Sequence, residues 1–583
     1  MPVFNAEISS QLEKVADLLD LEGAPRSRGR AYRMAARLVG ALTDNVADML
    51  VEGTLVKGTI PNGTPGHGLP GIGKDIADQI AAIVRGETPT MLDRAAHEPP
   101  AGITALLALP GLGPTRVHLM RQTLGIDTIE KLAAAVRAGK LRAVPGLGGK
   151  LEAKLLRIIS TGARLSQRTE RAAAEPVVAA LLRYLRQIPG VLRAEIAGSF
   201  RRRQETVGNL DIVVAIEAGR PVVQRFLGCE HITELIEQGP ARAIVRLRQG
   251  MQADLRVVPE ENFGAALCIF TGSKAHTVAL RRIAFGLGWR LDEHGLFDGV
   301  RRLGGRTEAE IYQHLGLAFV PPELREDQGE LDAARDGTLP HLVTTGDIRG
   351  DFHVRTTDGS GRGSLQEMVQ AAIVKGYGYI AIADHAHHTA AATARDPMLL
   401  ARQLDAIDRI NSGLDGFVVL KSCEVDILRD GSLDLPGPIL RRLDLVVGGI
   451  QSDFDLSSEE QTERMLRAMD NRCLDILAHP TGRLNQRPGV AMDNARVIRG
   501  AAERGCCLEL NARPDRLDLN DAHCRLAKQL GAKVAISSGA RAAEDLDFMR
   551  FGIDQARRGW LEKTDVLNTQ PLSGLREVLR QRR

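Results

Sequence analysis

The sequence has few aromatic residues and almost no surplus of charge. Phe, Trp and Tyr make up only 3% of its 583 residues. A protein that stacks many single-stranded bases on aromatic side chains is therefore disfavoured. The 76 Lys and Arg nearly balance the 73 Asp and Glu, which leaves a net charge of +3. So small a sum gives no indication of nucleic-acid binding, and local charge matters more.

The cysteine pattern excludes two further classes of protein. The 7 cysteines are odd in number, and none form a Cys-x-x-Cys pair. Cys506 and Cys507 are adjacent, which is poor geometry for a structural disulfide. Neither a disulfide framework nor a thiolate zinc finger is supported.

No apolar run approaches the ~18 residues that a membrane span needs. The first residues form an amphipathic helix pattern with acidic residues, which is not typical of a signal peptide. We therefore expect a reduced, cytoplasmic protein without membrane contact.

The composition that remains is that of an ordinary globular chain, with 44% hydrophobic and 26% charged residues. At roughly 150 residues per domain, the length predicts about four domains. Residues 1–165 show short helical patterns separated by Gly and Pro. From 166 to 260, runs rich in Val and Ile predict strands, with a helix at 174–188. Residues 261–325 return to helix with one or two short strands, and 326–345 are polar enough to predict a linker.

One turn recurs three times in the N-terminal part. An apolar-Pro-Gly-apolar-Gly sequence begins at Leu69, Leu109 and Val144, each time before a helical pattern. Two helices joined by such a turn form a helix-hairpin-helix unit, whose exposed backbone N–H groups can hold a DNA phosphate. A purely structural connector is the less favoured alternative. The candidate DNA-binding residues are the turn glycines Gly71, Gly73, Gly111, Gly113, Gly146 and Gly148.

The C-terminal part alternates strand-like and helical runs from residue 346 onward. This alternation predicts a mostly parallel sheet or barrel. His and acidic residues stand at the ends of its strand-like runs, where βα barrels carry their sites.

The segment 198–215 is the most specific in the chain. A turn that begins with glycine carries Ser199 and Arg202, which suits it to grip a polyphosphate. Asp211 begins one strand-like run and Asp254 ends another. Two carboxylates on neighbouring strands can hold a divalent ion for phosphoryl transfer.

The motifs GSFRRRQETVGNLD at 198–211, FTGSKAH at 270–276, LDEHGLF at 291–297 and PPELRE at 321–326 resemble those of the bacterial family X DNA polymerases, over essentially the whole chain. The resemblance implies a multidomain fold. It has all-α helix-hairpin-helix domains (a lyase-like domain at 1–90 and fingers at 91–165), an α+β nucleotidyltransferase palm at 166–260 and a thumb at 261–325. A linker at 326–345 leads to an α/β PHP barrel at 346–583, which is a phosphoesterase fold.

The resemblance also implies partners and cofactors. They are gapped or nicked DNA, a dNTP, Mg²⁺ or Mn²⁺ on palm aspartates, and Zn²⁺ or Mn²⁺ in the barrel. The implied nucleotide-binding residues are Ser199, Arg202, Gly208, Phe270 and Gly272.

The palm departs from the family at a catalytic position. Asn209 stands where an Asp normally bridges both metals, so one negative charge is missing beside Asp211 and Asp254. A charge contact at ~4 Å is worth about 4 kcal/mol at an effective dielectric near 20. Even half of that is more than a tenfold loss in rate. Three further family positions are changed, namely Arg203 for Gly, Ile269 for Tyr and Thr277 for Asn.

The lyase position is changed as well. Gln79 stands where relatives have the Lys that forms a Schiff base, and an amide cannot act as that nucleophile. Lys74 lies nearby but in another register.

The barrel motifs keep four of the nine metal ligands that the resemblance implies. These four are His353, His385, Glu424 and His479. The other positions hold Arg355, Ser360, Gln451, Gly539 and Arg541. A trinuclear site cannot be built from four ligands, because each metal needs about three or four of its own. We hypothesise that an arginine neutralises Glu424 in place of a metal, which leaves a pocket able to bind a phosphate without cleaving it.

The favoured interpretation is therefore a DNA-binding family X relative with weak or lost polymerase, lyase and nuclease activity. One alternative is an active gap-filling polymerase that tolerates Asn209 and holds metal on Asp211 and Asp254. Another is a PHP-type 3′-5′ exonuclease or phosphoesterase that uses Asp351, Asp384 and Asp426 as substitute ligands.

Overall fold

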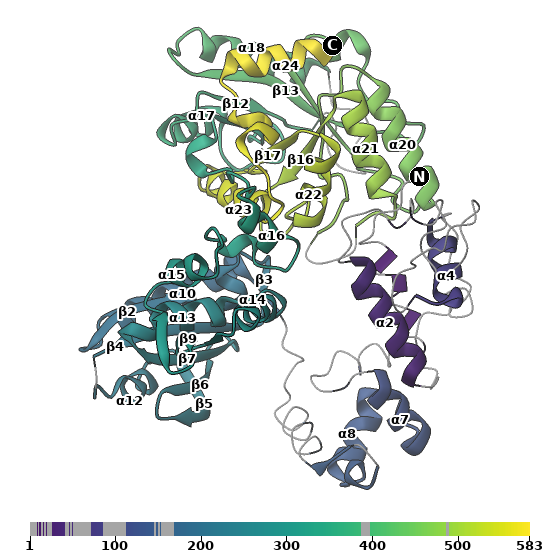
Figure 1. Ribbon diagram of the computed structural model, residues 1–583. Helices are drawn as coiled ribbons and strands as arrows, with labels where there is room; N and C mark the ends of the chain where they lie inside the picture. The colour runs from purple at the N-terminus through teal and green to yellow at the C-terminus, as the bar shows by residue number, and fades with distance from the viewer. Residues whose placement is uncertain are drawn as a thin grey trace. The chain divides into compact units, whose positions relative to one another are not determined.

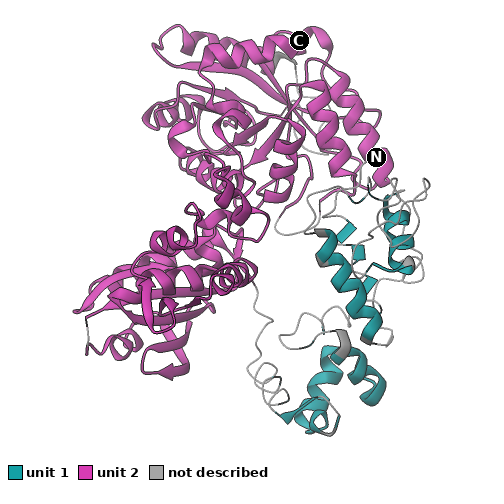
Figure 2. Cartoon of the chain, viewed as in Figure 1, with its two compact units in different colours: residues 1–167 teal, residues 168–583 magenta. Residues whose placement is uncertain are grey.

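The computed structural model divides the chain into two compact units, residues 1–167 and 168–583 (Figure 2). In the first unit, the structure describes residues 8–9, 11–12, 15–16, 19, 26–40, 46, 49, 72–84, 106, 112, 114–144, 147–149, 152 and 155. In the second, it describes residues 168–582 except 218, 386–396 and 485–488.

The described part of the first unit is helical, as the sequence predicts. Helices α2 (Arg26–Gly40) and α4 (Lys74–Val84) share one apolar core. Helices α7 (Pro114–Leu124) and α8 (Ile129–Arg137) share another, with the short turn η1 (Leu141–Ala143). The apolar residue between the two glycines of each hairpin turn is buried in these cores, and these residues are Ile72, Leu112 and Leu147.

The palm is a five-stranded sheet with the order β2-β4-β7-β6-β5. The strands β4 and β7 run parallel, and the other neighbours are antiparallel. The strands are β2 (Val191–Ile196), β4 (Asn209–Ile216), β5 (Ile232–Gly239), β6 (Arg242–Leu247) and β7 (Gln252–Pro259). Around them lie α10 (Arg171–Arg186), α11 (Gly198–Arg201), α12 (Val222–Leu227) and the small pair β1 (Thr169–Glu170) and β3 (Thr206–Val207).

The thumb has three strands where the sequence predicted one or two. They form the antiparallel sheet β8 (Arg290–Asp292), β9 (Gly295–Asp298) and β10 (Arg301–Gly304). The thumb helices are α13 (Phe263–Thr271), α14 (Lys274–Gly286) and α15 (Glu308–His314).

Residues 326–345, expected to be a linker, contain the helix α16 (Glu330–Asp336), which packs on the thumb. Leu331 and Ala334 belong to the thumb core, and buried Glu330 pairs with His276 of α14 at 2.5 Å. The composition suggested a linker because only two residues of this helix, Leu331 and Ala334, enter the core and the others are mostly polar. The segment is therefore part of the folded thumb.

The C-terminal part is a parallel barrel of seven strands, β11 to β17 in sequence order, with helices around its outside (Figure 1). The strands are β11 (Gly350–Val354), β12 (Tyr379–Ile382), β13 (Val418–Asp426), β14 (Leu445–Gly449), β15 (Ile476–Leu477), β16 (Cys507–Asn511) and β17 (Val534–Ser537). The helices are α17 (Leu365–Val374), α18 (Pro397–Asn411), α19 (Gly437–Leu440), α20 (Ser458–Asp470), α21 (Asn494–Arg504), α22 (Asp521–Leu530), α23 (Met549–Arg558) and α24 (Leu572–Arg582).

A buried amide helps to close the barrel between its first and last strands. Asn568, fully buried in the short turn η7 (Leu567–Thr569), donates to the carbonyls of Gly350 in β11 and Ile536 in β17, both at 2.8 Å. Its carbonyl accepts from the N–H of Ile536 at 3.1 Å. The strands β11 and β17 are thus joined through a side chain.

Ion pairs join the barrel to the palm within the second unit. Asp554 of α23 pairs with Arg171 at 2.5 Å and with Arg203 at 3.6 Å. Glu205 of the palm pairs with Arg483 at 2.6 Å and accepts from Gln555 at 2.5 Å. Buried or half-buried pairs of this kind hold geometry better than exposed ones.

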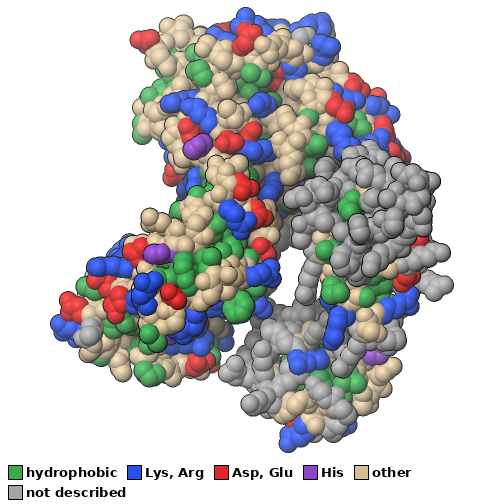
Figure 3. Space-filling view, in the orientation of Figure 1, with side chains coloured by type: hydrophobic (Ala, Val, Ile, Leu, Met, Phe, Trp, Pro, Cys, Tyr) green, Lys and Arg blue, Asp and Glu red, His purple; other side chains and the backbone are tan. Residues whose placement is uncertain are grey.

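The surface is mixed in charge, in line with the balanced composition. Basic and acidic side chains are interspersed over the visible face of the second unit (Figure 3). Among the described residues, no helix combines the length and the apolar character needed to cross a membrane. All 7 cysteines are free thiols, and six of them are buried.

Candidate active sites of the palm and the barrel

The palm brings its three predicted catalytic residues together. Asp211 of β4 and Asp254 of β7 are direct neighbours across the parallel pair. Asn209 lies two residues before Asp211 and so shares its face of the strand. Its Nδ2 donates a hydrogen bond of 2.8 Å to Asp211 Oδ1. One acceptor site of this carboxylate is therefore taken by an amide N–H.

The turn before β4 encloses Asp211. A Cβ atom at Gly198 would lie 2.1 Å from Asp211 Oδ2, and Gly198 has φ +60. Only glycine fits this approach. Burial, reinforced by the carboxylate of Asp254, raises the pKa of Asp211 to about 6.

Two arginines hold Asp254. Arg242 of β6 donates to both of its oxygens, at 2.9 and 3.3 Å. Arg256, two residues along β7, lies 3.1 Å from Oδ1 and also stacks on Phe270, with 4.8 Å to the ring centroid. Such a fork-shaped contact is the geometry in which guanidinium binds carboxylate most strongly.

This donor set does not fit a pair of Mg²⁺ ions. Mg²⁺ is held by carboxylate oxygens in near-octahedral geometry. Here one carboxylate accepts an amide N–H and the other is neutralised by guanidinium groups. Among the residues that the structure describes, no group of three or more His, Cys, Asp or Glu could hold a metal ion.

The residues expected to grip the nucleotide surround this centre from the turn and from α13. Arg202 donates to Thr271 O at 2.5 Å and to Glu326 at 3.0 Å. Gly272 has φ +68 and lies close to Arg202, and a Cβ atom there would be 3.2 Å from its Nη1. Ser199 lies in α11, one residue after Gly198, and Gly208 directly precedes β4.

The substituted family positions have clear structural settings. Arg203 adopts φ +58, which explains why a glycine is usual there. Its side chain forms an ion pair with Asp554 of the barrel at 3.6 Å. Ile269 packs against the thumb core, and Thr277 is buried in α14.

The barrel brings the four retained ligand candidates together, with the three histidines around Glu424 at the carboxyl end of its strands. Glu424 Oε2 lies 2.9 Å from His353 Nε2 and 3.3 Å from His385 Nε2. Glu424 Oε1 lies 3.3 Å from His479 Nε2. Arg355 binds Glu424 at 2.5 Å, which confirms that an arginine neutralises this carboxylate. Gln451, at another family His position, donates to Glu424 Oε1 at 2.8 Å.

Glu509 of β16 completes the cluster and was missed in the sequence. Its Oε1 lies 2.7 Å from His353 Nδ1, and its Oε2 accepts from the N–H of His479. The available signal was a single glutamate inside an apolar strand-like run. The structure buries this carboxylate fully, and a buried charge requires a partner.

The cluster is neutral through its own side chains. Burial opposes a charge on His353, but Glu509 and Glu424 outweigh it and raise the pKa of His353 to about 9. Burial would raise the pKa of Glu424, but Arg355 and His353 hold it well below its usual range. Burial would also raise the pKa of Glu509, but the charge of His353 outweighs it and lowers this pKa to about 2. Two carboxylates thus face His353⁺ and Arg355⁺. A metal ligand must be a neutral imidazole, so this arrangement does not fit a metal centre.

The proposed substitute ligands accept hydrogen bonds from neighbouring backbone and side-chain groups. Asp384 accepts from the N–H and hydroxyl of Thr356, at 2.8 and 2.6 Å. Asp426 accepts from Gln451 N and from Ser452 Oγ. Asp351 accepts from Ser538 N at 3.1 Å. Each carboxylate holds a loop in place.

The N-terminal candidates are described only in part. Gly73 and Gly148 are exposed at the starts of helical segments, in accord with amides that face a ligand. Gly71, Gly111, Gly113 and Gly146 lie outside the described residues. Gln79 is buried on the core side of α4, at 8% exposure, and the side chain of Lys74 is outside the described set.

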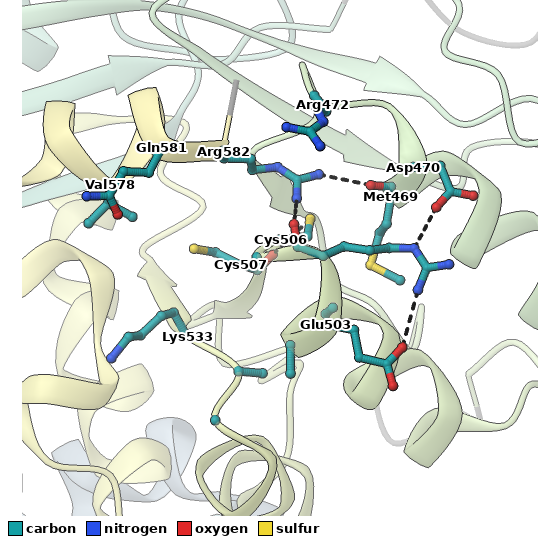
Figure 4. Close-up of a pocket in the computed structure, with 16 residues that line it drawn as sticks. Met469, Asp470, Arg472, Glu503, Cys506, Cys507, Lys533, Val578, Gln581 and Arg582 are labelled. Atoms are coloured by element: carbon teal, nitrogen blue, oxygen red, sulfur yellow. Dashed lines mark hydrogen bonds and ion pairs between the residues drawn. The ribbon is translucent and has the colours of Figure 1, made fainter.

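A cavity of about 460 Å³ lies at the opposite, amino-terminal end of the barrel strands (Figure 4). Its cations are mostly engaged. Arg582 donates to four backbone carbonyls, those of Leu474, Arg504, Met469 and Asn471. Arg504 pairs with Asp470 at 2.7 Å. The hydrogen bonds of Arg582 therefore fasten α24 to the barrel.

Comparison with known proteins places these sites in a family. A helix-hairpin-helix domain model matches residues 3–89, a SAM-like helix-hairpin-helix tandem matches 103–160, and a DNA polymerase beta thumb matches 266–326. The chain thus combines helix-hairpin-helix segments with a thumb of the DNA polymerase beta type.

Curated relatives cover the chain more fully. The DNA polymerase/3′-5′ exonuclease PolX of Bacillus subtilis (strain 168) is 32% identical over 580 residues, 98% of this chain and 99% of the relative. A probable phosphatase of Thermoanaerobacter sp. (strain X514) is 28% identical over 180 residues, 29% of this chain and 71% of the relative. A probable phosphatase of Syntrophotalea carbinolica (strain DSM 2380 / NBRC 103641 / GraBd1) is 25% identical over 229 residues, which are 37% of this chain and 90% of the relative. The chain belongs to the PolX family.

Proposed function

We propose that this PolX member binds gapped or nicked DNA during repair, with weak or lost polymerase, lyase and barrel nuclease activity. The observation that carries the proposal is shared by both sites. Arg242 and Arg256 bind Asp254 in the palm, and Arg355 binds Glu424 in the barrel. In each site, protein cations supply the positive charge that metal ions would bring.

Binding to DNA rests on the N-terminal half. Helix-hairpin-helix turns present backbone N–H groups to phosphates without reading bases. Gly73 and Gly148 are exposed in two of these turns. Because phosphate contacts release counterions, the affinity for DNA should fall steeply with salt.

The proposal is tested by primer extension on gapped DNA, with Mg²⁺ and then Mn²⁺. The native protein is compared with Asn209→Asp and with Asn209→Asp combined with Arg242→Gln. The first change restores a carboxylate, and the second removes one of the two arginines that bind Asp254. We expect at least a tenfold gain in extension rate in the double variant, because each change returns a charge contact to the metals. Asn494→Asp on α21 is the matched control.

Each rival has its own outcome. Robust extension by the native protein would establish an active gap-filling polymerase that tolerates Asn209. Loss of the 3′ end in the absence of dNTPs, together with two or three tightly bound metal ions per chain, would establish the PHP exonuclease. Either result overturns the proposal.

A further inference from the structure

Four arginines gather at the carboxyl ends of three neighbouring barrel strands. Arg355 follows β11, Arg541 follows β17, and Arg513 and Arg516 follow β16. Burial lowers the pKa of Arg541, and the charges of Arg355, Arg513 and Arg516 lower it further, while Asp515 opposes them. Like charges held together in this way cost stability unless an anion joins them.

Two of the four guanidinium groups have no partner among the described residues of the barrel. Arg355 is bound to Glu424 and Ser360, and Arg513 forms a fork with Asp515 at 2.9 and 3.0 Å. The side chains of Arg516 and Arg541 make no hydrogen bond or ion pair with any residue that the structure describes. The Nε of Arg541 is also buried without a partner.

The backbone around Arg541 fixes its position. The carbonyl of Ala540 accepts from Arg355 N at 2.9 Å, and Arg541 N donates to Asp545 at 3.0 Å. Gly539 has φ +62, and a Cβ atom there would lie 2.9 Å from Arg513 Cγ, so glycine allows this arginine to approach. The loop therefore holds these cations in place before any ligand arrives, which lowers the cost of binding.

We infer that this arginine cluster binds a phosphate dianion without a metal, with Arg541 and Arg516 as its direct ligands. The shape and charge of guanidinium match those of phosphate oxygens. Glu424 balances Arg355 and Asp515 balances Arg513, so the excess positive charge is that of Arg541 and Arg516. The inference rests on the proposed absence of metals from the barrel. The phosphate can be free, part of a nucleotide or the end of a DNA strand.

The test is calorimetric titration of the full chain in EDTA. The probes are inorganic phosphate, deoxyadenosine 5′-monophosphate, and one oligonucleotide carrying either a 3′-phosphate or a 3′-hydroxyl. We expect one saturable site for inorganic phosphate, weakened at least tenfold in Arg541→Ala and in Arg516→Ala. Arg541→Lys should lie between native and Ala because it keeps the charge and loses the fork. Arg580→Ala, on the exposed face of α24, should match the native protein.

The arms of the titration separate the sources of the phosphate. Tighter binding of the 3′-phosphorylated oligonucleotide, lost in Arg541→Ala, assigns the end of a DNA strand. Tighter binding of the nucleotide assigns that ligand, and equal affinity for the two oligonucleotides with retained phosphate binding assigns free phosphate.

The inference is overturned if none of the probes binds, if both alanine variants bind as the native protein does, or if binding disappears in EDTA. Metal analysis and primer extension on the same preparation test the proposed function separately. A protein that holds no metal, does not extend primers and does not bind phosphate would overturn this inference but leave the proposed function standing.

Discussion

At the scale of single residues, the palm site depends on a glycine as much as on its carboxylates. Gly198 combines φ +60 with a would-be Cβ contact of 2.1 Å to Asp211 Oδ2. We expect Gly198→Ala to lower the free energy of unfolding by at least about 3 kcal/mol, because strain and a clash with a buried group add. Gly250→Ala is the control, since it has φ +82 but nothing within 4 Å. Its expected cost is about 1 kcal/mol. Urea unfolding measures both, and equal costs would contradict the packing argument.

Asp211 should give the palm a recognisable pH dependence. Its pKa is raised to about 6 from 3.8, chiefly by burial. A raised pKa in the folded state means that protonation favours folding. The contribution is therefore full below about pH 4 and is lost as the pH rises through about 6, with a ceiling of about 3 kcal/mol.

The measurement for Asp211 is the urea midpoint at several pH values between 4 and 7. Asp211→Asn removes the titration, so its stability relative to native should increase across this range. Asp298→Asn, at a half-exposed side chain, should run parallel to native. A difference between native and Asp211→Asn that does not change with pH would show that Asp211 titrates normally.

At the scale of elements, one buried side chain makes three of the hydrogen bonds between the first and last strands of the barrel. Asn568→Ala leaves three buried backbone groups without partners, the carbonyls of Gly350 and Ile536 and the N–H of Ile536. At about 1–3 kcal/mol for each such group, we expect a loss of at least 3 kcal/mol. Hydrogen exchange at the Ile536 N–H should also accelerate.

Asn411→Ala is the comparison for Asn568. Its amide likewise bonds both backbone groups of one residue, Val419, but in a partly exposed setting where water can replace it. Asn411→Ala should therefore lower the free energy of unfolding clearly less than Asn568→Ala does. If the two variants lose the same stability, closure of the barrel does not depend on Asn568.

The elements and the site differed in how far the sequence could predict them. Regular patterns predicted the palm strands and the alternation of strands and helices in the barrel, because local periodicity records them. The ligand positions around Glu424 came from the resemblance to the family X motifs. The pairing of Arg242 with Asp254 follows from the register of β6 on β7, which no local pattern records. The role of Glu509 needs the neighbour relation of β16 to the other strands. Helix α16 was taken for a linker because one apolar face in seven residues is a weak signal.

At the scale of the whole molecule, palm, thumb and barrel form one compact unit, residues 168–583. Contacts that cross between them are far apart in sequence, as with Arg557 and Glu323 at 2.9 Å. These contacts place the palm turn against the barrel, with Arg203 and Arg171 both on Asp554. A substitution that looks like erosion of the nucleotide turn, Arg203 for Gly, thus also contributes to the junction.

We therefore expect residues 168–583 to unfold in one cooperative thermal transition. Asp554→Ala combined with Glu205→Ala removes two of the carboxylates that pair across the junction and leaves half-buried arginines without partners, which is costly. The transition should then divide into two, one for the palm and thumb and one for the barrel. Asp332→Ala with Glu577→Ala, at exposed side chains, should keep a single transition. Calorimetry decides the matter, because two transitions in the unmodified unit would mean that palm and barrel are energetically independent.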